Sequence, residues 1–499
     1  MKRKISDSNS AHCIRPLNIV FWIILIFSPV ILLAVIGLIS KQNVFYFHPL
    51  WSDEIDYWII SKNTSAHGLD IGYTGYYEVT GSFGKLGGHG ITSLILYGLF
   101  SLFGWGSNSI LICNTLWMVF SFIVFVVIAK PDIFTSILLS ISYFMFSGIL
   151  LYAASSMTET ANYALVVLFV SLCIYYQKQK NNSNRLLLVF LIIIMACVRF
   201  TYIILLFSFL FRKDDNGKLK KKRALLFLIM ICICFVTAKA FTDHFTSPYV
   251  VTRGIDYDSY TISQKADMVL QRTATNIRYY VIPTGSIGEK TFRISYLLTL
   301  CSCVFFSFFV IRNNGLIPKI IKKETVDYTF LSLSAVLFIF LCANILGYNC
   351  NDYRDFRLLS PILWGCFFYL IYCHHTHMIK EICALLLFSA VGAVLSYSFW
   401  DSNALRIGGL STDVSDLASL VEYTEDADSP WDNTIAIDDY SFAFISNLAP
   451  GIGIQYYQGF SDNCVKNSKF IYQKYTEYSF EGYDIIARNG SGILLKKSE

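Results

Sequence analysis

Long apolar stretches recur along the chain, separated by short polar segments. The first, Ile19–Ile39, is 21 residues long and follows a head that carries Lys2, Arg3, Lys4 and Arg15. A helix that crosses a bilayer needs about 20 apolar residues, and polar residues at one end can complete a shorter stretch. We expect membrane-spanning helices here and at Ser109–Ala129, Ile133–Tyr152, Ala161–Tyr176, Ala224–Phe241, Ile294–Ile311, Tyr328–Leu346, Leu358–Tyr372 and Ile382–Trp400.

Two further apolar stretches are interpreted from the basic loops beside them. Ile91–Phe103 has only 13 residues, and if it crossed the membrane the basic loop Gln177–Arg185 would lie outside, against the positive-inside tendency. We interpret it as an interfacial helix on the outer face. Leu186–Phe211 has 26 residues with Arg199 in its middle and basic clusters at both ends. Two half-spans that turn near Arg199 keep both clusters inside. The expected topology has about 11 membrane segments, with the N-terminus in the cytoplasm and the C-terminus outside.

The composition indicates an integral membrane protein. Of the 499 residues, 55% are hydrophobic and 15% are charged, and the mean hydropathy is +0.51. Soluble domains have roughly 25% charged residues, so a large part of this surface must face lipid. This excludes a single soluble domain, a disordered chain and a nucleic-acid-binding protein. We expect a multi-pass protein of the plasma (inner) membrane, in contact with membrane lipid.

Three regions lie outside the membrane in this topology: residues 40–90, 242–293 and 401–499. The last of them combines one helical stretch with three strand-like ones, at Val414–Tyr423, Thr434–Ile437, Tyr483–Ala487 and Gly492–Leu495. Its 15 acidic and 7 basic residues give it a net charge of −8, which leaves +13 for the rest of the chain. The predicted fold class is therefore a polytopic α-helical membrane domain over residues 1–400 and a small extracytoplasmic α/β domain over residues 401–499.

Carboxylates follow the first expected helix at the outer boundary. The first outer region opens with Asp53, Glu54 and Asp56. Carboxylates at a membrane boundary are costly unless they have a role or a partner, although a solvated loop start between interfacial tryptophans would also explain them. Glu159 follows the third span and faces the same compartment. By itself it also suits the first turn of a helix, where the helix dipole stabilises an acid.

Arginines gather on the same side of the membrane, where loops are normally poor in them. The arginines are Arg199, Arg253, Arg272, Arg278, Arg293, Arg354 and Arg357, and Lys239 lies on the same side. A guanidinium can bind two phosphate oxygens at once, which suits a lipid-phosphate head group, whereas snorkelling or pairing with loop aspartates would explain some of these residues without a ligand. Acids and phosphate-seeking cations at one boundary suit group transfer from a phosphate-linked lipid. A carboxylate then takes the proton of an acceptor hydroxyl, and the cations stabilise the departing phosphate.

The order of these motifs resembles that of the GT-C superfamily of polytopic glycosyltransferases, which includes protein mannosyltransferases and aminoarabinose transferases. Trp51–Trp58 is similar to the acidic motif of that superfamily's first outer loop, and Gly88–Gly104 resembles the juxtamembrane helix segment after it. Met157–Thr160 matches the position of a second acid. Arg357–Pro361 looks like the Arg-Tyr-Leu-x-Pro pattern near the donor phosphate, with Leu358 in place of the usual tyrosine. The resemblance extends along nearly the whole chain, but no lysine stands clearly in the phosphate role.

The resemblance implies an inverting transferase that moves a sugar from a polyprenyl-phosphate lipid to an envelope glycan, lipid or protein on the outer face. It assigns the catalytic base to Asp53, and it leaves Glu54 and Glu159 to position the acceptor or a cation. The phosphate-binding candidates are Arg278 and Arg357, with Arg272 and Arg253 competing, and the cavity candidates are His89, Asp56 and Tyr57. No metal ligands are assigned, and a divalent cation stays open as a cofactor.

Other functions stay open at this point. A transporter or flippase of lipid-linked sugars is expected to have inverted repeats and charges near the midplane, and neither is visible in the sequence. A polysaccharide polymerase or an acyl-transferring enzyme would share the outer arginines without needing Asp53 and Glu54. A non-catalytic relative would keep the motifs without turnover. His374–His377, Asp256–Asp258 and Asp438–Asp439 could bind a metal, but solvated loop positions explain them more simply.

Overall fold

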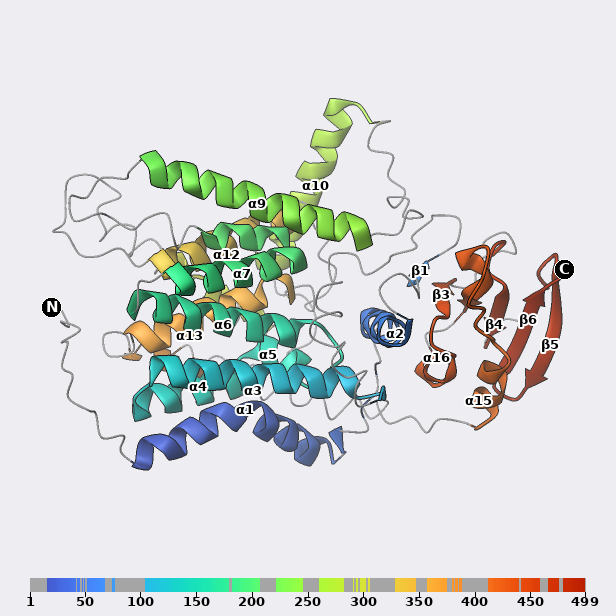
Figure 1. Ribbon diagram of the computed structural model, residues 1–499, viewed down its shortest axis with the longest axis horizontal. Helices are drawn as coiled ribbons and strands as arrows, with labels where there is room; N and C mark the ends of the chain where they lie inside the picture. Colours follow the sequence, from blue (N-terminus) through green and yellow to red (C-terminus); the bar gives the residue numbers. More distant parts are fainter. Residues whose placement is uncertain are drawn as a thin grey trace.

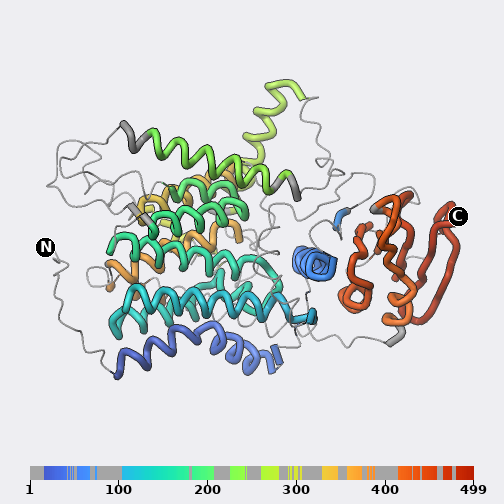
Figure 2. The backbone as a smooth tube through the Cα atoms, viewed as in Figure 1, coloured from blue at the N-terminus to red at the C-terminus, as the bar shows by residue number. Residues whose placement is uncertain are grey.

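The computed structural model describes the main helices and strands and part of the connections between them. The described residues are 16–41, 43–44, 47, 49, 52–67, 74–76, 104–178, 182–206, 221–245, 260–281, 290, 293–294, 297–301, 304–305, 328–346, 357–374, 379–380, 382–384, 386–387, 412–438, 441–457, 465–474 and 479–498. Figure 1 shows a bundle of helices and a separate sheet, with helix α2 seen end-on between them. Figure 2 follows the chain from α1 in the bundle to α2 beside the sheet, back into the bundle, and finally to the C-terminal strands.

The bundle consists of helices that follow the apolar stretches of the sequence. They are α1 (Pro16–Ser40), α3 (Ser109–Ala129), α4 (Ile133–Met145), α5 (Ser147–Tyr152), α6 (Glu159–Lys178), α7 (Asn182–Val198), the 3-10 helix η6 (Phe200–Leu206), α9 (Lys221–Phe245), α12 (Tyr328–Leu346) and α13 (Ser360–His374). Helix α10 (Ile262–Val281) packs on α12 at the edge of the bundle. Within the described residues, Pro16–Ser40, Ser109–Ala129, Glu159–Lys178 and Thr329–Leu346 are long and apolar enough to cross a membrane.

Most of the predicted spans are helices in the structure. The helices expected at Ser109–Ala129 and Tyr328–Leu346 are present with the same bounds. The stretches Ile294–Ile311, Ile382–Trp400 and Ile91–Phe103 lie wholly or largely outside the described residues. The structure therefore supports a multi-pass helical membrane protein without testing the expected number of segments.

Local sequence explains how α3 turns into α4. Helix α3 ends where Lys130 adopts a left-handed conformation (φ 48°), and the backbone N–H of Lys130 still bonds to Val126 O. Two residues later, Asp132 caps α4 by accepting a hydrogen bond from the Thr135 N–H at 2.7 Å. The indole N–H of Trp22 donates to Pro131 O at 2.8 Å, which ties α1 to this turn.

Burial separates the core of the bundle from its lipid-facing surface. Helix α6 is buried along most of its length and packs on both α3 and α13. By contrast, α1 and α9 expose large apolar side chains such as Leu38 (78% exposed) and Val236 (63% exposed). Contiguous apolar surface of this kind is rare on soluble monomers, so these two faces suit contact with lipid.

Two interruptions in the bundle bring side chains to one end of it. The stretch Ile133–Tyr152, expected as one helix, is split at Phe146, whose backbone is extended (φ −75°, ψ 111°). The ring of Phe146 packs against Trp364 at 5.5 Å, and Gly148 allows a close approach of α5 to Tyr163, because a Cβ on Gly148 would lie 2.7 Å from the Tyr163 hydroxyl. The second interruption lies at Arg199: α7 ends at Val198 and η6 begins at Phe200.

The C-terminal part forms a mixed six-stranded sheet with strand order β1-β3-β2-β4-β6-β5. The strands are β1 (Thr74–Tyr76), β2 (Thr434–Ile437), β3 (Gly453–Tyr456), β4 (Phe470–Gln473), β5 (Tyr483–Asn489) and β6 (Gly492–Lys497). The first four in the spatial order are parallel, and β6 and β5 join as an antiparallel hairpin. Helices α15 (Thr412–Ser419) and α16 (Phe442–Asn447) pack together, and Phe444 of α16 stacks on Tyr472 of β4 at 3.8 Å. We call residues 412–498 the C-terminal sheet region.

The sheet is not built from the tail alone. Strand β1 comes from the first interhelical region and pairs with β3 through Thr74 and Ile454. The predicted strands at 434–437, 483–487 and 492–495 are present, whereas β1, β3 and β4 were not expected. One apolar cluster extends from the bundle through Ile55 and Trp58 of α2 to Phe442 and Ile454 in the sheet region, so α2 is packed on both sides.

Candidate active site

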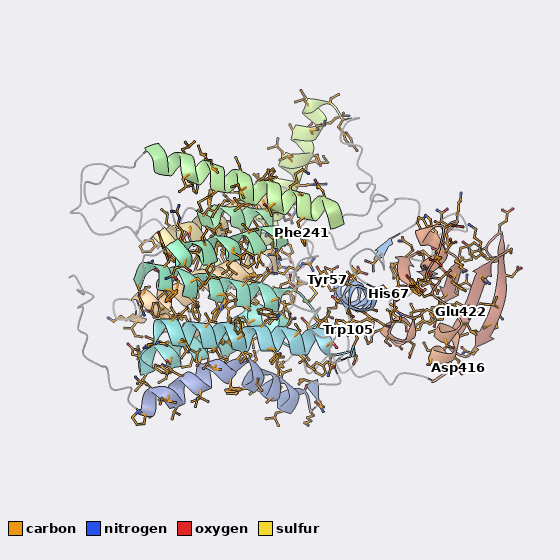
Figure 3. The ribbon with its side chains drawn as sticks, viewed as in Figure 1. Tyr57, His67, Trp105, Phe241, Asp416 and Glu422 are labelled. Atoms are coloured by element: carbon orange, nitrogen blue, oxygen red, sulfur yellow. The ribbon has the colours of Figure 1, made fainter. Side chains whose placement is uncertain are left out.

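Helix α2 (Ser52–His67) begins with two of the predicted acids. Asp53 and Glu54 lie in its first turn, where a negative charge is favourable because the free N–H groups and the helix dipole face it. Asp53 and Tyr57 are four residues apart and therefore share one face of the helix. Figure 3 shows Tyr57 on the side of α2 toward the bundle and His67 on the side toward the sheet.

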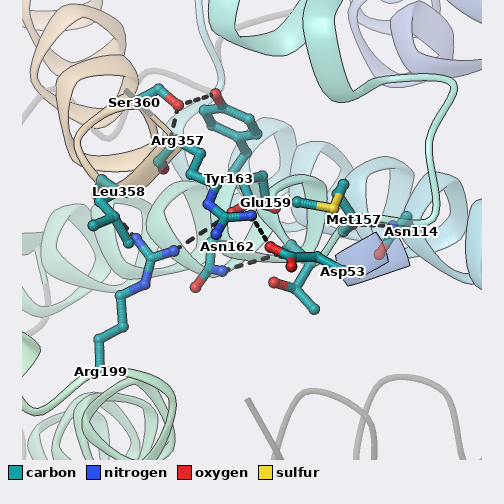
Figure 4. A network of polar contacts seen from close by, with 11 residues as sticks. Asp53, Asn114, Met157, Glu159, Asn162, Tyr163, Arg199, Arg357, Leu358 and Ser360 are labelled. Atoms are coloured by element: carbon teal, nitrogen blue, oxygen red, sulfur yellow. Dashed lines mark hydrogen bonds and ion pairs between the residues drawn. The ribbon is translucent and has the colours of Figure 1, made fainter. Parts of the chain in front are cut away.

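Asp53 forms an ion pair with Arg357. The guanidinium Nη1 of Arg357 donates to Asp53 Oδ2, joining residues that are 304 positions apart in the sequence. The Asp53 side chain is 33% exposed and the Arg357 side chain 23% exposed, so both charges can be reached from outside. Figure 4 shows the Arg357 guanidinium between Asp53 and Glu159.

A second, buried pair lies beside the first. Arg199 Nη2 is 3.7 Å from Glu159 Oε1, and the two side chains are 8% and 1% exposed. Arg199 Nη1 also donates to Leu358 O at 2.9 Å, which fixes the turn that carries Arg357. The helix break at Arg199 therefore places the guanidinium, which lies in an apolar stretch, beside the carbonyl of Leu358 and the carboxylate of Glu159.

Electrostatics couple the two pairs to Tyr57. Burial lowers the pKa of Arg357, but the carboxylates of Glu159 and Asp53 more than offset this, so its pKa is raised and its charge is permanent. Burial raises the pKa of Tyr57 well above its ordinary value, and the charges of Glu159 and Asp53 act in the same direction. Tyr57 therefore stays a neutral phenol that can donate a hydrogen bond.

Glu54 differs from Asp53 in its surroundings. Its side chain is fully buried, and Oε1 accepts a hydrogen bond from the Ser156 N–H at 2.8 Å. This contact attaches the start of α2 to the segment between α5 and α6. The sequence assigned Glu54 to position the acceptor or a cation, and in the structure its carboxylate is turned into the protein, toward the backbone of Ser156.

Side chains that the sequence did not indicate hold the segment before Glu159 and the start of α13. Asn114 of α3 donates to Met157 O at 2.9 Å, and Tyr163 donates to Ser360 Oγ at 2.6 Å. The sequence contains no signal for these pairings. Arg199 was recognisable as a cation in the middle of an apolar stretch, but nothing local indicated that it would meet Glu159.

Two acceptor atoms beside the pairs have no donor within the described part of the chain. They are Glu159 Oε2 and Asn162 Oδ1, both buried. Buried polar atoms nearly always have a partner, either in the protein or in water or a ligand. These two atoms are therefore places where a hydroxyl donor would be stabilised.

The other predicted site residues lie apart or outside the described residues. Arg272 and Arg278 lie on α10, which Figure 1 shows pointing away from α2, and neither belongs to the network of Figure 4. Asp56 is a half-buried residue of α2. His89 and Arg253 are outside the described residues, and so is most of the histidine segment at 374–377. In the described ranges, no cluster of three or more His, Cys, Asp or Glu residues is arranged to hold a metal ion.

Comparison with known proteins gives structural likenesses only. No family model matches the chain, and no curated protein matches it. Among solved structures, ArnT from Cupriavidus metallidurans in the apo state has 9% identity and a TM-score of 0.42, covering 93% of this chain and 97% of that one. The same protein bound to undecaprenyl phosphate has 11% identity and a TM-score of 0.41 over the same shares.

A third solved structure is the archaeal oligosaccharyltransferase AglB from Archaeoglobus fulgidus in complex with an inhibitory peptide and a dolichol-phosphate. It has 12% identity and a TM-score of 0.43, covering 89% of this chain and 69% of that one. All three likenesses have TM-scores below 0.5, so the chemistry of the site has to follow from its own residues.

Proposed function

We propose that this protein is a glycosyltransferase that moves a sugar from a polyprenyl-phosphate lipid to an envelope glycan, lipid or protein acceptor on the outer face of the plasma membrane. The observation that supports this most directly is the contact between Asp53 and Arg357. It places an accessible carboxylate and an accessible guanidinium together at the end of a membrane bundle. A carboxylate that can take a proton and a guanidinium that can stabilise a departing phosphate together suit transfer from a lipid phosphate.

Arg357 is the phosphate ligand in this proposal. Its charge is permanent, and its planar fork matches two phosphate oxygens. Arg199 and Glu159 act from the buried side: Arg199 holds the backbone at Leu358, and Glu159 balances the two guanidinium charges. Arg253, Arg272 and Arg278 are left as candidates for outer contacts with the lipid head group.

Asp53 is the base in the transfer step. Its carboxylate takes the proton of the acceptor hydroxyl while the acceptor oxygen forms a bond to the anomeric carbon of the sugar. The bond from that carbon to the phosphate oxygen breaks, and the polyprenyl phosphate leaves with its new negative charge beside Arg357. Glu159 Oε2 and Asn162 Oδ1 would accept hydrogen bonds from hydroxyls of the sugar or the acceptor. Tyr57, Asp56 and His89 are proposed to contribute to the acceptor side of this site.

The ion pair has a consequence for this mechanism. An inverting displacement has the attacking and leaving oxygens on opposite faces of the sugar carbon, so the base and the phosphate ligand must stand apart with the sugar between them. In direct contact, Asp53 and Arg357 are too close for both roles. We therefore propose that donor phosphate displaces the Asp53 carboxylate from Arg357, and that the sugar then lies between these two groups while α2 keeps Asp53 in place to act as the base.

The test is transfer by the purified protein in lipid vesicles. A panel of radiolabelled undecaprenyl-phosphate sugars is supplied together with envelope lipid and glycan fractions, and labelled product and released undecaprenyl phosphate are measured. Asp53→Asn should lower turnover by about 10²–10⁴-fold, the usual contribution of a general base. The matched control is Asp416→Asn, which changes an exposed acid on α15 in the sheet region (Figure 3) and should leave turnover unchanged. Transfer by Asp53→Asn at the wild-type rate would refute the assignment.

A further inference from the structure

The second half of α2 is held by a short loop of the C-terminal sheet region. Asn63 is fully buried, and its side-chain amide makes two bonds to the backbone of this loop. Nδ2 donates to Ile452 O at 3.0 Å, and Oδ1 accepts from the Gly451 N–H at 2.8 Å. One side chain therefore satisfies a backbone donor and a backbone acceptor at once, which fixes both the distance and the orientation of the loop.

Two neighbours of Asn63 add contacts to the same loop. Lys62 Nζ donates to Leu448 O at 2.7 Å and to Ser446 O at 3.2 Å. The His67 ring lies against Tyr423 with the ring centroids 4.5 Å apart, and its Nε2 is 3.1 Å from Pro450 O. The carbonyls of Ser446, Leu448, Pro450 and Ile452 thus face the last two turns of α2.

Gly451 makes this loop geometry possible. Its φ of +96° is in the region that favours glycine, and a Cβ at this position would lie 2.5 Å from the ring of Tyr423. Immediately after the loop, β3 pairs with β1 through Ile454 and Thr74. The sheet region therefore holds the first interhelical segment at two places, through α2 and through β1.

The first half of α2 carries Asp53 and contacts the bundle beside the candidate active site. Glu54 accepts the Ser156 N–H, and the Trp58 indole N–H donates to Gly106 O at 3.0 Å while its ring packs edge-on against Phe442 of α16 at 4.9 Å. Asp53 and Asn63 are separated by about 15 Å along one helix, because each residue rises about 1.5 Å. A helix of this length moves as a unit, so a tilt at Asn63 is also a displacement at Asp53.

We infer that Asn63 is a positioning residue, and that through it the C-terminal sheet region sets the position of Asp53 opposite Arg357. The effect on catalysis rests on the proposed function, whereas the mechanical coupling does not. Asn63 touches no reacting atom. It acts through α2, and its loss lets the start of the helix leave the geometry that the Glu54 and Arg357 contacts define.

The test compares Asn63→Ala with Asn433→Ala. Asn433 is the matched control, because its side-chain amide also makes two hydrogen bonds to the backbone. It accepts from the Thr424 N–H and donates to Thr424 O, both at 2.7 Å, inside the sheet region and away from α2. Hydrogen–deuterium exchange of residues 53–60 is measured for both variants in lipid nanodiscs. Loss of a buried hydrogen-bonding partner changes an opening equilibrium by about tenfold or more. We therefore expect the exchange rate of residues 53–60 to rise by about tenfold or more in Asn63→Ala and to stay unchanged in Asn433→Ala.

Kinetics give the second readout. With undecaprenyl-phosphate sugar as the donor, Asn63→Ala should lower kcat without raising the donor KM, because the displaced group is the base and the phosphate ligand stays in place. Lys62→Met keeps most of the apolar side chain while removing two bonds to the loop. This variant should also raise the exchange of residues 53–60 and lower kcat, but by less than Asn63→Ala. It replaces Asn63→Ala in the test if that variant does not fold.

The outcomes separate the two proposals. Raised exchange confined to residues 61–67 and 446–452, with residues 53–60 and kcat as in the wild type, would overturn the positioning role. A rise in KM at constant kcat would overturn it as well. Raised exchange at residues 53–60 in a protein that transfers no sugar from any donor would refute the proposed function and leave the coupling intact.

Discussion

The buried pair of Arg199 and Glu159 offers a quantitative test of the network beside Asp53. Arg199 Nη2 and Glu159 Oε1 are 3.7 Å apart, and the side chains are almost fully buried. At an effective dielectric constant of 20, two unit charges at this separation attract by about 4 kcal/mol. Removing one partner of such a pair leaves the other charge uncompensated and typically costs about 3–5 kcal/mol.

Arg199→Met should therefore lower the free energy of unfolding by about 3–5 kcal/mol, which includes the lost bond to Leu358 O. Glu159→Gln should also destabilise, because Arg199 and Arg357 then share fewer negative charges. In the double variant neither Arg199 nor Glu159 is left charged and alone. The double variant should thus be more stable than the sum of the single effects indicates, with a coupling energy of about 2 kcal/mol or more, inside the range measured for residues in one network.

The assay is a double-mutant cycle in lipid bicelles, with unfolding by denaturant followed through tryptophan fluorescence. A control cycle uses Lys239 and Asp243, whose charged atoms are closer together, at 2.8 Å, but whose side chains are 56% and 59% exposed. Exposed pairs on one helix contribute only about 0.3–0.5 kcal/mol, so burial and not distance should decide the result. Effects of Arg199→Met and Glu159→Gln that add to within about 0.5 kcal/mol would refute the coupling.

Two further predictions concern single residues. Arg357→Lys keeps the positive charge but loses the planar guanidinium that can donate two parallel hydrogen bonds. Binding of undecaprenyl phosphate, measured by calorimetry in detergent, should therefore weaken by roughly 10–100-fold, the equivalent of one charge-assisted hydrogen bond. Unchanged affinity would remove Arg357 from the phosphate site. Burial lowers the pKa of Lys62 from its ordinary 10.5 to about 8. Between these values the unfolded chain holds a proton that the folded chain has released, so folding becomes more favourable as the pH rises through that window. Measured against Lys62→Met, wild-type stability should rise by up to about 3 kcal/mol from pH 8 to pH 10.5, and a flat difference in unfolding midpoint would contradict this.

The helices were largely predictable because their cause is local. A bilayer demands a continuous apolar stretch with internally satisfied backbone groups, and such a stretch is visible residue by residue. This is why the bounds of α3 and α12 agree with the sequence. The split of α4 from α5 at Phe146 was not visible, because it depends on the contact with Trp364 and on the close packing at Gly148.

The sheet was predictable only in part. Strand β2 and the β5–β6 hairpin were found from their local pattern, whereas β3 and β4, of the same four-residue length as β2, were not. Strand β1 has three residues and lies far from its partner in the sequence. A strand of that length exists because β3 is already in place to receive it, so no local analysis can detect it.

The candidate site shows the same division between local and long-range causes. The sequence by itself determined that carboxylates at Asp53 and Glu159 and a guanidinium at Arg357 lie near helix ends, because charges are expelled from apolar spans. Only the tertiary structure decided which charges meet: Asp53 with Arg357, Arg199 with Glu159, and Glu54 with the backbone of Ser156. These choices depend on how α2, α6 and α13 pack across hundreds of residues. The same long-range packing placed α2 against the loop at Gly451, and so made the C-terminal sheet region a neighbour of the site.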